Sequence, residues 1–198
     1  MNKIPILLLA AGQSRRMGGA DKLMQEIDGE PLLRRSARIA MTAGPVIAAL
    51  PPAPHPRHGA LAGLDIEIVE VPDAAEGMNA SLRRAVAALP PQAPAAMVLL
   101  ADLPDLTAQD LSLVLGAIDF STKNLVWRGT TEDGRPGHPV VFHKALFTEL
   151  LALTGDGGAQ SVAQAHKDRQ VLVPLPYQNA RTDLDTPEAW ADWRAKRQ

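Results

Sequence analysis

Two cations and three carboxylates in this sequence have the types and positions that phosphate chemistry requires. Arg16 and Lys22 lie in the segment LAAGQSRRMGGADK near the start of the chain. Asp102 follows the apolar run MVLL, and Asp183 and Asp185 stand two residues apart in RTDLDTPEAW. Cations neutralise phosphate oxygens, and Mg²⁺ takes one or two carboxylates together with phosphate oxygens and water. The pattern predicts a site for a polyphosphate and a divalent cation.

The cationic loop matches none of the common phosphate-binding or nucleophile motifs. It is neither a Walker A sequence nor G-x-G-x-x-G, and Ser14 lacks the second glycine of a nucleophile elbow. Ala10, Ala11 and Gly12 are small enough for a ligand to approach the backbone, and Gly18 gives the loop conformational freedom. Backbone N–H groups with Arg16 and Lys22 could form a polyphosphate cradle, but a solvated surface loop has the same composition.

Each group of carboxylates also has two interpretations. Asp102 leaves an apolar strand, where a carboxylate is costly unless it is paired or bound to a metal; a turn aspartate is the alternative. Asp183 and Asp185 point to the same side of an extended segment, and one of them could complete a metal site with Asp102. Acidic residues before a helix N-terminus are the alternative for this pair.

The elements that must position these residues alternate between strands and helices. Apolar runs predict strands at 4–10, 45–50, 65–71, 95–101, 124–130, 138–142 and 170–175, and helical periodicity predicts helices at 30–44, 78–89, 107–118, 144–155, 159–166 and 186–198. This alternation predicts an α/β fold of three layers with a doubly wound, mostly parallel, Rossmann-like sheet. Because ligands bind beyond the carboxyl ends of such strands, the cationic loop and Asp102 are expected at one site.

Several local signals fix helix ends in this prediction. Pro31 is expected in the first turn of the helix at 30–44, and Thr107 with Asp110 resembles a capping box. Thr186 followed by Pro187 predicts the start of the last helix. These signals predict where three of the helices begin.

Other segments carry weaker signals. The proline-rich stretch Pro51–Gly59 is predicted to be a mobile loop, and its two histidines have no third metal ligand nearby in sequence. His138 begins a strand and could be a substrate contact or a strand-entry residue. Trp190 and Trp193 are expected to pack the last helix against the sheet.

Composition limits the class of protein. The 198 residues are expected to form a single domain, 1–198, with 46% hydrophobic and 21% charged residues. A net charge of -2 argues against nucleic-acid binding, and the sequence has no cysteine for disulfides or thiolate metal sites. With no signal peptide pattern and no membrane-length apolar run, we expect a cytoplasmic protein.

Taken together, the motifs resemble those of one enzyme family. LAAGQSRRMGGADK looks like the signature loop of nucleotidyltransferases with a glycosyltransferase-A-like, nucleotide-diphospho-sugar transferase-like fold. The ordered set of EGMNASL, LLADLPDL, GHPVVF, GDGGAQ and DLDTPEAW is similar to that of the molybdenum cofactor cytidylyltransferases, and it extends over nearly the whole chain. A dehydrogenase is disfavoured because its glycine fingerprint and ribose-binding acid are missing.

The resemblance implies a reaction and a set of site residues. CMP would pass from CTP to the terminal phosphate of molybdopterin with release of pyrophosphate, assisted by Mg²⁺ or alternatively Mn²⁺. The implied catalytic residues are Arg16, Lys22 and Asp102, and the implied metal ligands are Asp102, Asp185 and Asp183. The implied nucleotide- and substrate-binding residues are Leu9, Ala10, Ala11, Gly12, Ser14, Gly18, Lys22, Gly77, Asn79, Ser81 and His138. A molybdoenzyme or its maturation chaperone is the implied protein partner.

Departures from the family pattern leave alternatives open. RMGGADK has one residue more than the usual cytidylyltransferase loop and is more similar to the molybdopterin guanylyltransferases, whereas AAG and DLDTP favour the cytidylyl type. In the segment GDGGAQ, Gln160 replaces the arginine that is usual in the family, which weakens an expected anion contact. The alternatives are a guanylyltransferase using GTP, a nucleotidyltransferase for a sugar phosphate or methylerythritol phosphate, and a nucleotide-binding regulator without turnover.

Overall fold

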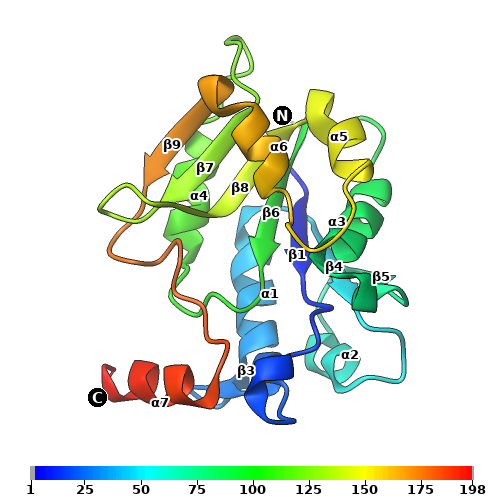
Figure 1. Ribbon diagram of the computed structural model, residues 1–198, viewed down its shortest axis with the longest axis vertical. Helices are drawn as coiled ribbons and strands as arrows, with labels where there is room; N and C mark the ends of the chain where they lie inside the picture. Colours follow the sequence, from blue (N-terminus) through cyan, green and yellow to red (C-terminus); the bar gives the residue numbers. More distant parts are fainter. Residues whose placement is uncertain (1–2, 198) are drawn as a thin grey trace.

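A computed structural model describes residues 3–197 and contains one seven-stranded sheet (Figure 1). The strand order is β5-β4-β1-β6-β8-β7-β9, and only β8 runs antiparallel to its neighbours. The strands of this sheet are β1 (Ile6–Leu9), β4 (Val46–Leu50), β5 (Glu67–Glu70), β6 (Ala95–Leu100), β7 (Val126–Thr130), β8 (Pro136–His143) and β9 (Gln170–Pro174). A separate two-stranded hairpin consists of β2 (Glu26–Ile27) and β3 (Glu30–Pro31).

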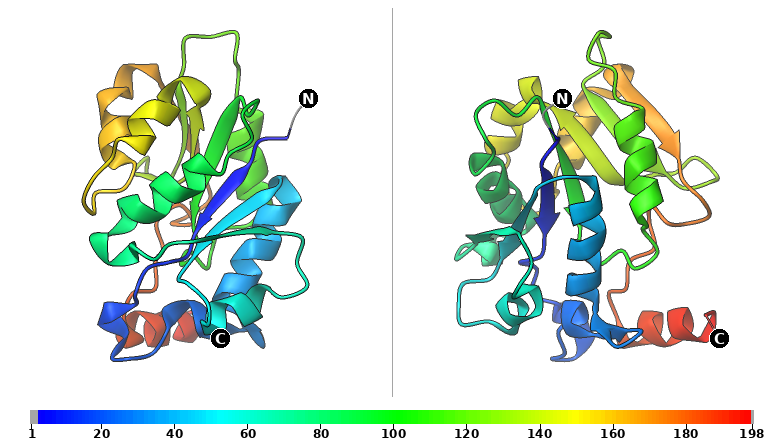
Figure 2. Two further views of the ribbon diagram at one scale, coloured as in Figure 1. Left: turned by 90° about the vertical axis from the view of Figure 1, so that its right-hand side faces the viewer. Right: turned by 180° about the vertical axis from the view of Figure 1, so that it is seen from behind.

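Helices cover both faces of the sheet and complete three layers (Figure 2). Apolar residues of α1, α2 and α4 pack in the core on one face, and those of α3, α5 and α6 pack on the other; the two tryptophans of α7 join the first of these cores. The helices are α1 (Leu32–Ala43), α2 (Pro56–Leu61), α3 (Met78–Ala87), α4 (Ala108–Gly116), α5 (Phe147–Leu151), α6 (Gln160–Ala165) and α7 (Pro187–Ala195). The predicted α/β class and mostly parallel sheet are confirmed.

The first strand explains why the sequence begins with an uninterrupted apolar run. Ile6 and Leu8 face one core, whereas Leu7 and Leu9 face the other. Because β1 lies between β4 and β6 in the middle of the sheet, both of its faces are buried and no polar position is tolerated. The cationic loop therefore leaves the sheet from its centre.

The predicted helix starts are largely confirmed. Thr107 and Asp110 form a reciprocal capping box at α4, and Thr186 caps α7 with Pro187 at its first position. Pro31 differs by one position, since it precedes α1 as the capping residue and also belongs to β3. The helix expected at 144–155 is shorter, because only Phe147–Leu151 is α-helical.

The prediction of a loop over Pro51–Gly59 is wrong in its second half. Helix α2 begins at Pro56, whose fixed φ suits the first turn, and His55 Nδ1 accepts a hydrogen bond from the backbone N–H of Arg57 at 3.3 Å. The Arg57 side chain is only 2% exposed. The segment is therefore anchored to the core.

The last helix packs differently from expectation. Trp190 and Trp193 are buried, but Trp193 Nε1 donates a hydrogen bond of 2.8 Å to Asp105 in the loop after β6. Arg194 donates to the backbone carbonyl of Glu26 in the β2–β3 hairpin at 3.3 Å. Helix α7 thus ties this loop and the hairpin together instead of lying on the sheet. In residues 3–197 no helix is long and apolar enough to cross a membrane.

Candidate active site

A cavity of about 500 Å³ opens at the carboxyl ends of the central strands. It is walled by the loop after β1, the start of α3, the end of β6 and residues far along the chain. Its lining residues are Leu9, Ala10, Ala11, Gly12, Gln13, Ser14, Arg15, Arg16, Lys22, Leu23, Ala74, Ala75, Glu76, Gly77, Met78, Ser81, Leu100, Asp102, Asp156 and Asp185. This volume and this position at the edge of a parallel sheet are typical of a small-ligand site.

One ammonium group connects two carboxylates in this cavity. Lys22 Nζ forms ion pairs with Asp102 Oδ2 and, at 2.5 Å, with Asp185 Oδ1. The other oxygen of Asp185 pairs with the guanidinium of Arg16, most of whose side chain is exposed. Lys22 and Asp102, 80 residues apart, meet here because they follow the adjacent parallel strands β1 and β6, and Asp185, 163 residues from Lys22, joins them from the segment before α7.

The protonation equilibria of the network follow from these contacts. Burial would lower the pKa of Lys22, but the charges and hydrogen bonds of Asp102 and Asp185 outweigh it and raise that pKa. Burial would raise the pKa of Asp185, but the hydrogen bond and charge of Lys22 outweigh burial and lower that pKa. Burial and the adjacent Asp185 raise the pKa of Asp183. Near neutral pH, Lys22 is therefore charged and Asp185 is the stronger anion of the pair.

The carboxylate oxygens of this site suit a hard divalent cation. Asp102 Oδ1 is buried and has no hydrogen-bond partner, so it keeps free lone pairs beside Asp185. In residues 3–197 no group of three or more His, Cys, Asp and Glu side chains is arranged to enclose a metal. Two carboxylates with open positions fit Mg²⁺, which keeps water and substrate oxygens as ligands.

A buried ion pair holds the cationic loop in place. Arg57 donates to both oxygens of Asp21, at 2.8 and 2.7 Å, to the carbonyl of Ala10 at 2.6 Å and to Ser14 Oγ at 3.3 Å. Although burial raises it, the hydrogen bonds and charge of Arg57 lower the pKa of Asp21 overall. Arg57 on helix α2 thus joins the beginning and the end of the loop, and no sequence motif predicted this role.

The opposite wall is fixed by the start of α3. Asp156 Oδ1 accepts a hydrogen bond of 2.8 Å from the backbone N–H of Met78. Gly77 has φ +116°, and a Cβ there would lie 2.7 Å from Asp156 Oδ1, so only glycine fits this approach. The segments EGMNASL and GDGGAQ are thereby brought together at the cavity.

Most of the residues proposed from sequence line this cavity. They are Leu9, Ala10, Ala11, Gly12, Ser14, Arg16, Lys22, Gly77, Ser81, Asp102 and Asp185. Ser14 nevertheless directs its hydroxyl inward, where it accepts from the backbone N–H of Lys22 at 3.2 Å and contacts Asp21 and Arg57. Its structural contacts make it a support for the loop.

Four of the proposed residues are not part of the lining: Gly18, Asn79, His138 and Asp183. Asn79 is 1% exposed, and its Nδ2 donates to the carbonyl of Thr154 at 2.7 Å. The structure therefore gives Asn79 the role of anchoring the 154–158 loop to α3 in place of the expected ligand contact. Asp183 lies behind Asp185, with which it shares a hydrogen bond.

His138 lies on β8 beside the cavity. Burial and, less strongly, the charge of Arg128 lower the pKa of His138 to about 4, although Asp102 acts in the opposite direction. Its Nδ1 is buried without a hydrogen-bond partner. His138 is therefore a neutral imidazole at physiological pH.

This lowered pKa predicts a stability change on acidification. Because the unfolded chain binds a proton at His138 near pH 6.5 and the folded chain only near pH 4, the free energy of unfolding should fall as the pH drops through this window. Urea unfolding of the wild type and of His138→Gln between pH 7 and 4 measures it. Relative to His138→Gln, the wild type should lose free energy of unfolding as the pH falls from 7 to 4. A stability difference that does not change with pH would contradict the lowered pKa of His138.

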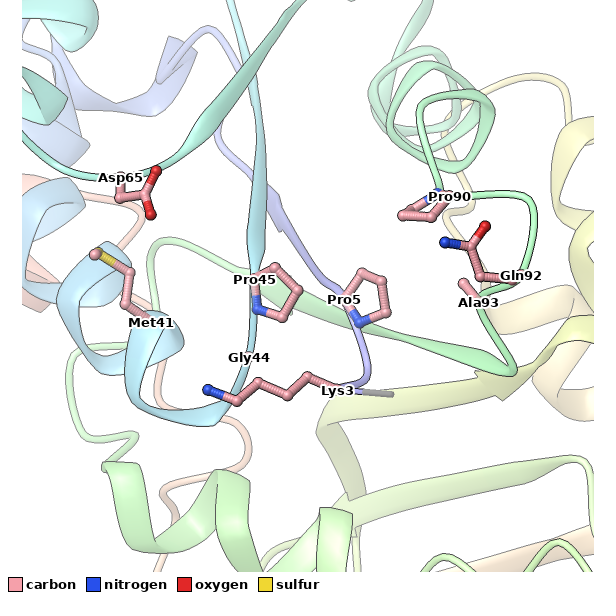
Figure 3. A pocket seen from close by; sticks show the side chains of 9 residues that line it. All are labelled: Lys3, Pro5, Met41, Gly44, Pro45, Asp65, Pro90, Gln92 and Ala93. Carbon is pink, nitrogen blue, oxygen red and sulfur yellow. The ribbon is translucent and has the colours of Figure 1, made fainter. Parts of the chain in front are cut away.

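The described residues also line two further cavities. One of about 430 Å³ adjoins the main cavity and shares Ala11, Gly12 and Gln13 with it, so the two together form one extended depression. Another, of about 450 Å³, lies at the amino ends of the strands beside Pro5, Pro45 and Pro90 (Figure 3). Among the described residues, Lys3 and Asp65 are the only charged ones in its lining, in contrast to the clustered charges of the main cavity.

A parallel sheet with a cationic loop and facing carboxylates at its carboxyl edge is the arrangement of an NTP-using nucleotidyltransferase. The chain belongs to the family of MobA-like NTP transferase domains, whose family model matches residues 6–171. The protein is accordingly an enzyme of the nucleotidyltransferase class, with small-molecule substrates. A search of curated protein sequences found no match.

Solved structures of similar proteins share this fold. Rv0371c from Mycobacterium tuberculosis H37Rv is 26% identical, with a TM-score of 0.81 and 98% and 97% of the two chains covered; it has also been solved in complex with manganese. A nucleotidyl transferase from Methanothermobacter thermautotrophicus is 21% identical, with a TM-score of 0.77 over 99% and 98%. A CMP:2-keto-3-deoxy-manno-octonic acid synthetase, solved with CTP, is 14% identical, with a TM-score of 0.71 over 98% of both chains.

Proposed function

We propose that this enzyme transfers CMP from CTP to the terminal phosphate of molybdopterin and releases pyrophosphate. The observation that carries the proposal is the meeting of Lys22, Arg16, Asp102 and Asp185 at the loop after β1. Transfer to a phosphate needs neutralised charge and in-line positioning more than an acid–base pair, and these four residues supply charge of both signs. The product would pass to a molybdoenzyme or its maturation chaperone.

Each residue has a distinct role in this reaction. An oxygen of the acceptor phosphate attacks the α-phosphorus of CTP, and the bond from that phosphorus to the pyrophosphate oxygen breaks. Lys22 stabilises the negative charge that develops on the α-phosphate, and Arg16 holds the departing pyrophosphate. The small residues Ala10–Gly12 let the triphosphate approach the backbone N–H groups of the loop.

Asp102 and Asp185 are the residues that would hold a divalent cation. Bound there, Mg²⁺ or Mn²⁺ would neutralise phosphate oxygens and increase the electrophilicity of the phosphorus. The buried free oxygen of Asp102 supports this assignment, and the manganese complex of the mycobacterial relative makes Mn²⁺ a reasonable alternative to Mg²⁺. Asp185 is preferred over Asp183, because the raised pKa of Asp183 makes it the weaker anion.

The choice of CTP over GTP rests on Asp185 and on the similarity to a synthetase solved with CTP. Asp185, part of the DLDTP segment that favours the cytidylyl type, binds both cations of the site. The fold of the synthetase accommodates a cytidine nucleotide in complex.

The test is a pyrophosphate-release assay with the full chain, molybdopterin, Mg²⁺ and each of the four NTPs. We expect turnover with CTP to exceed that with GTP by at least about tenfold, the ratio that a free-energy difference of 1.4 kcal/mol gives. Removal of the metal with EDTA should abolish release, and Mg²⁺ or Mn²⁺ should restore it. A preference for GTP would contradict the nucleotide assignment alone, and release with sugar phosphates but not with molybdopterin would contradict the acceptor assignment.

A further inference from the structure

Two arginines are buried in residues 3–197, and only one of them has a counter-ion there. Arg57 is neutralised by Asp21, as described above. Arg128 on β7 is 9% exposed, and its one hydrogen bond runs from Nε to the carbonyl of Gly137 at 2.9 Å. Within residues 3–197, no carboxylate pairs with its guanidinium. A buried cation without an anion is costly, so an uncompensated arginine in the middle of a strand indicates a ligand of opposite charge.

The surroundings of Arg128 increase this excess of positive charge. Burial and the charge of Arg181 both lower the pKa of Arg128. Arg181 is exposed and donates from Nη1 to the carbonyl of Pro136 at 2.9 Å, so part of its guanidinium remains free for a ligand. The hydrogen bond of Arg128 uses Nε, and its two Nη atoms are not fully buried. Both Nη atoms therefore reach solvent.

The position of Arg128 relates it to the active site. In the sheet, β8 lies between β6, which ends before Asp102, and β7, which carries Arg128. His138 on β8 is within electrostatic reach of both Asp102 and Arg128. Arg128 alternates with Val126, and His138 with Val140, so both point to the face of the sheet that α3 covers. That face also carries the α3 wall of the cavity, with Met78 and Ser81.

We propose that Arg128 and Arg181 form an oxyanion-binding site that holds a phosphate group of the acceptor substrate. The site rests on the proposed function for the identity of its ligand. Asp102 is flanked by the cationic loop on the β1 side and by Arg128 on the β7 side. Since in-line displacement needs the acceptor and the leaving pyrophosphate on opposite sides of the α-phosphorus, a phosphate held on the β7 side approaches from the correct direction. His138, on the strand between β6 and β7, is neutral and adds no charge beside Arg128.

The first test detects the anion directly and does not depend on enzymatic activity. The Arg128 Nε–H signal of the ¹⁵N-labelled full chain, assigned by its absence in Arg128→Lys, is followed by NMR during titration with inorganic phosphate. We expect a saturable shift of this signal and at least about tenfold weaker phosphate binding at this site in Arg181→Gln, the effect of losing one charge-assisted partner. Arg135→Gln is the matched control, because Arg135 lies in the turn between β7 and β8 and is already paired with Asp133.

The second test uses the transfer reaction. Arg128→Gln should raise the KM for the acceptor at least about tenfold and leave the KM for CTP within about twofold, and Arg128→Lys should restore part of the loss. If Arg128→Gln does not fold, Arg181→Gln gives the same comparison from an exposed position.

The outcomes separate this site from the proposed function. A shift confined to Arg16, with Arg128 unmoved, would show that phosphate enters only the loop after β1 and would overturn the site. If the wild type does not use molybdopterin but Arg128 still binds phosphate, the proposed acceptor is wrong and the anion site stands. Equal acceptor KM values for wild type and Arg128→Gln would exclude a role in acceptor binding.

Discussion

Replacing Lys22 with methionine is expected to lower kcat for nucleotidyl transfer by about 10²–10³-fold, the loss that follows removal of one preorganised donor to a developing charge. Lys22 is the cation that contacts both Asp102 and Asp185, and its raised pKa keeps it charged at neutral pH. Methionine keeps most of the volume of the side chain and removes the charge. The fold should be retained, because Lys22 lies on a loop outside the core.

The same substitution should affect metal binding in the opposite direction. In this structure the ammonium group of Lys22 neutralises the oxygens that would coordinate a divalent cation. Without it, Asp102 and Asp185 repel each other and attract a cation more strongly. We therefore expect Lys22→Met to bind Mn²⁺ at least as tightly as the wild type while turnover is lost, whereas Asp102→Asn should lose both.

Single-turnover kinetics and Mn²⁺ titration by electron paramagnetic resonance measure these two effects. Lys144→Met is a suitable control, because Lys144 is exposed just after β8 and far along the chain from the loop. Unchanged turnover in Lys22→Met would exclude the catalytic role, and loss of the circular dichroism signal would instead indicate that Lys22 is needed for folding.

The meeting of Lys22 and Asp102 could be predicted from the sequence, because the order of the central strands implies it. The apolar runs at β1 and β6 are long and buried on both faces, so their assignment as central parallel strands depends on few assumptions. Once two such strands are adjacent, the loops that follow them must meet, and Lys22 and Asp102 are brought together across 80 residues. The starts of α4 and α7 could also be predicted from the sequence, because their capping residues act within a few positions of the helix end.

The ion pair of Arg57 and Asp21, which holds the cationic loop, could not be predicted from the sequence. It depends on the burial of an arginine, a residue type that is usually exposed. Four prolines between 51 and 56 obscured the start of α2, although Pro56 at the first helical position favours it. Nothing in the local sequence distinguishes Arg57 from a solvated arginine. Its burial becomes visible only when α2 packs beside the loop and Asp21 meets it.

The same limitation applies to small polar residues of the motifs. Ser14 and Asn79 lie in segments that a ligand approaches, yet both direct their side chains toward the protein, to Lys22 N–H and to the Thr154 carbonyl. A motif identifies which residues are near a site. It does not distinguish a residue that contacts the ligand from one that holds the loop, since either use satisfies the same hydrogen-bonding groups.

Replacing Asp21 with asparagine is expected to reduce the free energy of unfolding by about 3–5 kcal/mol, because it leaves the buried guanidinium of Arg57 without its counter-ion. Arg57→Met should cost less, since the Asp21 side chain is 23% exposed and water can solvate the remaining carboxylate. The double variant Asp21→Asn/Arg57→Met removes both charges and should be more stable than Asp21→Asn alone. Urea unfolding of the four proteins gives the coupling energy of the pair.

Nucleotide binding distinguishes a positioning role of this pair from simple stabilisation. Arg57 fixes the carbonyl of Ala10 and, through Asp21, the residue that precedes Lys22, so both ends of the loop should shift when it is lost. We expect calorimetric titration at a temperature where all variants remain folded to give at least about tenfold weaker CTP binding for Arg57→Met, and partial recovery in Arg57→Lys, which keeps the charge but not the bidentate geometry. The lowered pKa of Asp21 also predicts a pH dependence of stability. The ion pair stabilises the fold above the ordinary carboxyl range, and this stability is lost as the pH falls through the folded-state pKa of Asp21. Arg57→Met should not show this loss. Normal CTP binding by a folded Arg57→Met protein would mean that the loop holds its shape without the buried ion pair.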